Sequence, residues 1–175
     1  VFGHNNNPAV RLVNALVDTA SCALVALLAC YWEPDERRKR SPAILALALA
    51  AVCPFTAIYV ALILTEVPTT FFAITRCLLT TFAFRAATFK RSLWWWGATG
   101  LLAGIAVFFR PDSGLFAGAI GLTLVITWLL EPRTADEDAT WLRVRWHRAP
   151  RVLAQGAVLS VAFLAVLVPW TVRNW

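Results

Sequence analysis

Long apolar runs separated by short polar connections are the feature that most constrains this chain. Six runs approach or exceed the length of about 20 apolar residues that crosses a lipid bilayer. Of the 175 residues, 59% are hydrophobic and only 15% are charged, whereas a soluble domain has about a quarter charged. A soluble globule is therefore excluded as the leading interpretation. The predicted spans are residues 9–31, 42–64, 69–89, 93–109, 114–130 and 152–170.

The spans predict an all-α fold, because lipid cannot satisfy the open backbone hydrogen bonds of other structures. We expect a polytopic transmembrane helical bundle forming one membrane domain over residues 1–175. The short fourth and fifth spans form a predicted hairpin, packed through Gly100-x-x-x-Gly104 and Gly114-x-x-x-Gly118. Pro54 predicts a kink in the second span. The run of Trp94, Trp95 and Trp96 predicts an aromatic belt at the membrane interface.

The basic residues predict the orientation of the spans. Twelve of the sixteen Lys and Arg residues lie in or beside the connections 32–41, 90–92 and 131–151, which alternate with the other connections. The positive-inside rule makes these three loops cytoplasmic. The net charge of +6 does not indicate a nucleic-acid partner, because the basic residues flank apolar runs instead of lining one continuous face.

The opposite membrane face gathers a small set of polar residues from distant parts of the chain. They are Glu66, Arg110, Asp112, Arg173 and Asn174. Glu66 is interpreted either as an exposed turn acid or as a carboxylate at the mouth of a site, and Arg110-Pro111-Asp112 is also ordinary turn chemistry. Arginine is disfavoured on this face, and its planar fork matches phosphate oxygens. A phosphate-bearing lipid is therefore the predicted ligand.

Three further charged residues lie within the spans. Asp18 and Arg76 are placed deep in the first and third spans, and Arg11 precedes Asp18 on the same helical face. Buried charges persist mainly when they are paired or face a polar cavity. We predict a structural, supporting role for these residues, and an Asp18–Arg76 ion pair is one hypothesis for it.

Several motifs, taken in order, resemble bacterial GT-C glycosyltransferases of the family 39 type, which are related to protein O-mannosyltransferases and aminoarabinose lipid A transferases. The motifs are residues 2–4 (FGH), 9–16 (AVRLVNAL), 64–66 (LTE), 100–106 (GLLAGIA), 110–111 (RP) and 169–174 (PWTVRN). The resemblance covers nearly the whole chain. It implies a multi-pass enzyme of the bacterial inner membrane that moves a hexosyl or pentosyl group from a polyprenyl-phosphate carrier to an acceptor at the extracytoplasmic face.

The resemblance also implies roles for individual residues. Arg110 and Arg173 would lie near the lipid-linked phosphate, with Asp112 and Asn174 beside them, and Glu66 would help to position donor or acceptor. Arg11 matches a frequent family arginine with a supporting role. The acceptor is left open as a lipid, a glycan or a protein.

The catalytic residues of such an enzyme are not expected within this sequence. The resemblance puts the acidic base in a loop before Val1 and a periplasmic part after Trp175, and the chain has no methionine. We therefore expect an internal fragment that is inactive alone. No cofactor motif and no metal-ligand spacing are identified, and a requirement for a divalent metal stays open.

A transporter or lipid flippase segment is the alternative function, with Glu66, Asp18 and Arg76 lining a translocation path. Transporters often carry internal repeats, and no convincing repeat is found, since Pro54 has no counterpart in the later spans. A membrane scaffold without catalytic function is a third interpretation. Neither alternative accounts for the closing residues 169–174.

Overall fold

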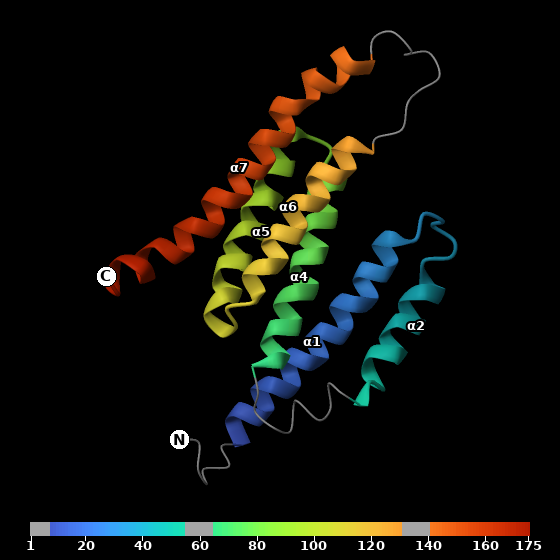
Figure 1. Ribbon diagram of the computed structural model, residues 1–175. Helices are drawn as coiled ribbons and strands as arrows, with labels where there is room; N and C mark the ends of the chain where they lie inside the picture. The colour runs from blue at the N-terminus through green and yellow to red at the C-terminus, as the bar shows by residue number, and fades with distance from the viewer. Residues whose placement is uncertain (1–7, 55–64, 131–140) are drawn as a thin grey trace. The chain divides into compact units, whose positions relative to one another are not determined.

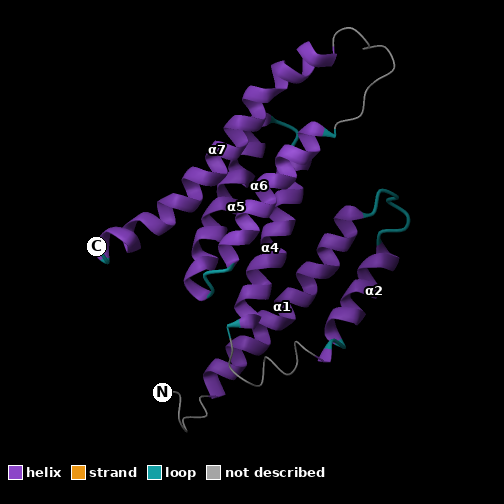
Figure 2. Ribbon diagram, viewed as in Figure 1, coloured by secondary structure: helices purple, strands orange, loops and turns teal. Residues whose placement is uncertain are grey.

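The computed structural model describes residues 8–54, 65–130 and 141–175, with side chains of the last range described from Arg148 onward. Every regular element within these ranges is an α-helix (Figure 2). The helices are α1 (Pro8–Trp32), α2 (Arg40–Ala51), α4 (Glu66–Arg85), α5 (Phe89–Phe109), α6 (Ser113–Leu129) and α7 (Trp141–Arg173). The predicted all-α membrane helical bundle is confirmed.

Among the described residues, four helical segments are long and apolar enough to cross a membrane. They are α1, α4, α5 and the Arg148–Arg173 part of α7. The 17 residues of α6 and the 12 described residues of α2 make shorter apolar helices. The chain divides into two compact units, Val1–Leu78 and Leu79–Trp175, so that α4 contributes to both.

The first unit contains a hairpin of α1 packed on α2 (Figure 1). Its connection carries ion pairs between Lys39 and Glu36 and between Arg38 and Asp35. Helix α2 ends at Ala51, ahead of Pro54, because the proline ring clashes with the carbonyl of the fourth residue before it. The remainder of the predicted 42–64 span lies mostly outside the described residues.

The connection between α4 and α5 covers residues 86–88 instead of the predicted 90–92, so it is equally short but lies earlier in the chain. Helix α4 ends at Arg85, and Thr88 caps α5 by accepting a hydrogen bond from the Arg91 amide at 3.3 Å. A threonine oxygen in this position satisfies an otherwise unpaired amide of the first helical turn. Lys90, which was expected in a loop, therefore lies within the first turn of α5.

The second unit is organised by close packing of α5 along α7 (Figure 1). A Cβ atom added at Gly100 would lie 2.2 Å from the Leu159 carbonyl oxygen, and one at Gly104 would lie 2.7 Å from Val166 Cβ. The two helices run parallel, because residues later in α5 contact residues later in α7. The predicted partner was wrong: the first glycine motif packs against α7, not against α6, and a Cβ at Gly118 would meet nothing within 4 Å.

The core of this unit contains Ala83, Trp96, Leu124 and Leu159. Trp96 is fully buried, with its ring 5.2 Å from that of Phe84, while Trp94 is 81% exposed. The predicted interfacial belt is therefore wrong for Trp96. Successive residues of a helix point about 100° apart, so three adjacent tryptophans cannot share one face.

A short polar relay ties three helices of the second unit together. Gln155 Nε2 of α7 donates to Ser92 Oγ of α5 at 3.0 Å, and Ser92 Oγ donates to the Ala83 carbonyl of α4 at 2.9 Å. Ser92 is buried, and a satisfied polar contact of this kind fixes the register of packed helices in lipid.

Replacing Gly100 by alanine should destabilise the second unit, since its methyl group would collide with the α7 backbone. We expect a loss of about 1–3 kcal/mol, the usual effect of overpacking, seen as a lower thermal midpoint in detergent. Gly118→Ala is the matched control and should leave the midpoint unchanged or slightly higher. Equal midpoints for both variants would contradict the α5–α7 packing.

Candidate functional site

The α5–α6 turn positions two of the predicted site residues. Phe109 ends α5, Arg110 adopts an extended backbone, and the Ser113 amide donates to the Arg110 carbonyl at 2.9 Å. Pro111 occupies the second turn position, for which its fixed backbone angle is suited. The sequence prediction of a four-residue turn is confirmed by this hydrogen bond.

Arg110 and Asp112 form an ion pair across this turn. Arg110 Nε lies 3.0 Å from Asp112 Oδ2, and the two side chains are 44% and 56% exposed. Asp112 precedes α6, but its side chain makes no capping hydrogen bond to the helix. The carboxylate thus holds the guanidinium group instead of the helix terminus, and it restricts the direction in which the arginine fork points.

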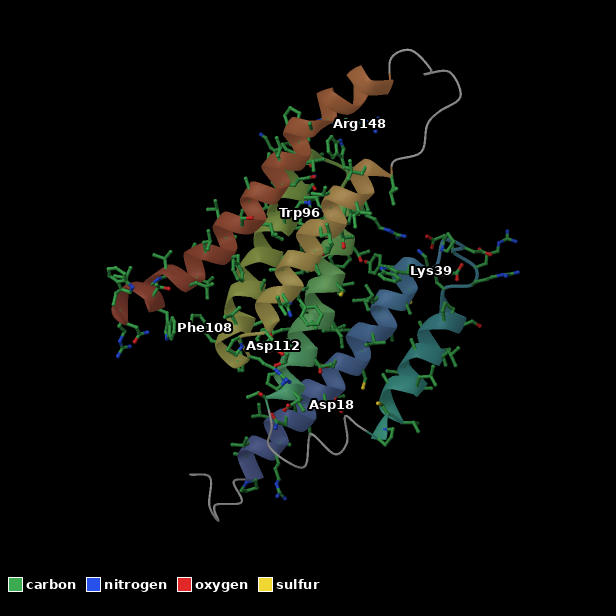
Figure 3. The ribbon with its side chains drawn as sticks, in the orientation of Figure 1. Asp18, Lys39, Trp96, Phe108, Asp112 and Arg148 are labelled. Atoms are coloured by element: carbon green, nitrogen blue, oxygen red, sulfur yellow. The ribbon has the colours of Figure 1, made fainter. Side chains whose placement is uncertain are left out.

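Arg173 and Asn174 lie at the same end of the second unit as this turn. Arg173 is the last residue of α7, and Asn174 Nδ2 donates to the Trp170 carbonyl at 2.8 Å. The rings of Phe108 and Trp170 are 6.4 Å apart in an edge-to-face arrangement, and Figure 3 shows both Phe108 and Asp112 at this end of the unit. We call this end, with Arg110, Asp112, Arg173 and Asn174, the turn end.

The opposite end of the same unit is basic, and we call it the basic end. It carries Arg85, Lys90, Arg91, Arg148 and Arg151. Among the described residues of this unit Asp112 is the sole acid, and it lies at the turn end. The charge asymmetry favours the cytoplasm for the basic end, which would put the turn end on the extracytoplasmic side.

Glu66 belongs to the first unit, where it is the first residue of α4 and is half-buried. An acid in the first helical turn interacts favourably with the positive end of the helix dipole. The carboxylate therefore lies at the amino-terminal end of α4, a position that fits both interpretations of Glu66. Its proximity to Arg110 and Arg173 stays a prediction.

The charged residues within the spans also belong to the first unit. On α1, Arg11 is exposed and Asp18 is half-buried. Arg76 on α4 is fully buried, and its Nε donates to the Phe72 carbonyl at 3.0 Å. No ion pair between Asp18 and Arg76 is found among the described residues, and the hydrogen bond to Phe72 ties Arg76 to its own helix.

No metal centre is found where the structure describes the chain. Within those ranges, no three His, Cys, Asp or Glu residues lie close enough to hold an ion. The sequence interpretation placed Arg148 and Arg151 in the loop 131–151 and used them only to orient the spans, whereas both belong to α7, which begins at Trp141. Their signal was the three-residue spacing of Arg148 and Arg151 directly before an apolar run, which puts both on one helix face.

The helices and the polar turn end define an integral-membrane protein of the helical-bundle class. The chain belongs to the dolichyl-phosphate-mannose-protein mannosyltransferase family, whose family model matches residues 1–172. It is therefore a membrane glycosyltransferase in the general sense of that family, as the motif resemblance implied. Neither a curated protein nor a solved structure was found to match the chain.

Replacing Asp112 by alanine should barely change the stability of the protein. Its ion pair with Arg110 is exposed, and exposed pairs contribute about 0–1 kcal/mol. Thermal unfolding in detergent measures the effect, with Arg38→Ala, which removes the exposed ion pair with Asp35, as the matched control. A loss several times larger for Asp112→Ala would show that this carboxylate is needed for folding and not for orienting Arg110.

Proposed function

We propose that this chain is part of an enzyme that transfers a sugar from a polyprenyl-phosphate carrier to an acceptor at the extracytoplasmic membrane face. The observation that carries the proposal is that Arg110 and Arg173 lie at the same end of the second unit, away from the bulk of the basic residues. Membership of a glycosyltransferase family supports the same conclusion.

The chemistry of the turn end suits a phosphate leaving group. During transfer, the bond between the sugar and the phosphate oxygen breaks, and negative charge develops on the phosphate. Guanidinium groups stabilise such charge through charge-assisted, often bidentate hydrogen bonds. Arg110 and Arg173 are assigned this role, since both are exposed at the turn end.

The neighbouring residues would orient these two arginines. Asp112 holds Arg110 through Nε, so that the terminal nitrogens of the fork would face the phosphate. Asn174 is tied to the last turn of α7 and would add an amide contact beside Arg173. Glu66 would help to position donor or acceptor, while Arg11, Asp18 and Arg76 would support the first unit.

The family is named for dolichyl phosphate, mannose and a protein, and this name indicates the class of substrate. A polyprenyl carrier suits helices lined on the outside by exposed apolar residues such as Leu115, Leu164 and Val172. The proposal places the enzyme in the bacterial inner membrane with a lipid, glycan or protein acceptor. Family membership favours this function over the transporter or flippase alternative.

Arg110→Ala and Arg173→Ala should each weaken the binding of polyprenyl phosphate by the full chain. Hydrogen bonds to charged groups contribute about 1.5–3 kcal/mol, so we expect each loss to be roughly tenfold or larger. Titration of labelled polyprenyl phosphate into the protein in detergent measures the affinity. Arg110→Lys should recover only part of it, because lysine lacks the bidentate fork.

The matched control is Arg85→Ala, which removes one exposed arginine from the basic end. This variant should bind polyprenyl phosphate like the parent. The phosphate assignment is wrong if both turn-end variants keep the parent affinity, or if all three variants weaken binding equally.

A further inference from the structure

A hollow of about 660 Å³ opens at the basic end of the second unit. Its apolar wall is formed by Phe84, Leu124, Trp128 and Val152, and two arginines of α7, Arg148 and Arg151, border it. Figure 3 shows Arg148 at the opposite end of this unit from Phe108 and Asp112. The hollow is thus separate from the turn end and lies on the side favoured as cytoplasmic.

The packing around the hollow is fixed by contacts already present in the fold. Gln155, which also borders it, donates to Ser92 Oγ at 3.0 Å, and Ser92 donates to the Ala83 carbonyl. Leu124 is a member of the buried core. The α6 and α7 walls are therefore held in place on α4 and α5, and the hollow does not require a rearrangement to exist.

The two arginines have a shared orientation. They are three residues apart on α7, which places them on one helix face, and both are exposed at their outer ends. Below them, toward the membrane interior, the same face continues with Val152 and Gln155. A positively charged rim beside an apolar wall is the arrangement expected of a groove that binds an amphiphile with an anionic headgroup.

We propose that this hollow binds an anionic phospholipid of the cytoplasmic leaflet. Its phosphate would contact Arg148 and Arg151, and an acyl chain would lie against Phe84, Leu124 and Trp128. Basic pockets between membrane helices on the cytoplasmic side recognise such headgroups through charge. The site is independent of the proposed sugar-donor site at the turn end, and either one can fail without the other.

A second basic hollow, of about 470 Å³, lies near by on α5 and supplies a control. It is bordered by Lys90, Arg91, Trp94 and Trp95. Lys90 and Arg91 do not border the first hollow. Replacing both removes two positive charges from the basic end, as replacing Arg148 and Arg151 does, but leaves the first hollow intact. Comparing lipid binding by the two double variants, one at Arg148 and Arg151 and one at Lys90 and Arg91, distinguishes a defined site from a general attraction to anionic lipid.

The test is native mass spectrometry of the full chain titrated with phosphatidylglycerol or with phosphatidylcholine of the same acyl chains. Each basic residue near an anionic surface contributes enough for about a fivefold change in affinity. Arg148→Gln with Arg151→Gln should therefore weaken phosphatidylglycerol binding at least about tenfold. Phosphatidylcholine binding should not change. Lys90→Gln with Arg91→Gln should have a much smaller effect, and an equal effect of the two double variants would overturn the site.

A variant that keeps every charge tests the apolar part of the hollow. Thr127 borders it and is exposed, so Thr127→Trp should fill the space and weaken phosphatidylglycerol binding without lowering the thermal midpoint. Unchanged binding by this variant would overturn the proposal even if the arginine double variant failed to fold. Soluble glycerol phosphate should not displace the lipid, and displacement would contradict a lipid ligand.

Discussion

The close approach of α5 to the backbone of α7 is the interaction on which the second unit depends. At Gly100 there is no room for a side chain, since an added Cβ would be 2.2 Å from the Leu159 carbonyl oxygen. Lipid provides no hydrophobic force between helices, so small residues that permit close packing determine which helices associate. Because the two helices run parallel, their carboxyl ends lie on the same side, and Arg110 and Arg173 are both at that end of the unit.

The same orientation separates two kinds of charge. Arg110, Asp112 and Arg173 occupy the turn end, while Arg148 and Arg151 lie on the far side of the buried core at Trp96. One end is mixed in charge and is proposed to bind the phosphate of a sugar carrier. The other is basic, is favoured as cytoplasmic, and borders the hollow proposed for an anionic phospholipid.

The sequence was sufficient for features that depend on local pattern. Apolar length predicted the all-α membrane bundle, and Pro111 predicted the turn that carries Arg110. Features that depend on tertiary partners were not predictable in this way. The glycine motif showed that a close neighbour exists but not that it is α7, and Trp96 looked interfacial because burial is decided by the helices around it. Asp18 and Arg76 lie at similar depth in their predicted spans, but this similarity was not enough to predict which residues they contact.

We propose that the phosphate of the lipid-linked donor binds at the turn end of the second unit. The sharpest test is photo-crosslinking of the full chain in membranes with a polyprenyl phosphate that carries its reactive group beside the phosphate. We expect crosslinked peptides that contain Arg110 and Arg173. Crosslinks confined to peptides of the basic end, around Arg148 and Arg151, would contradict it.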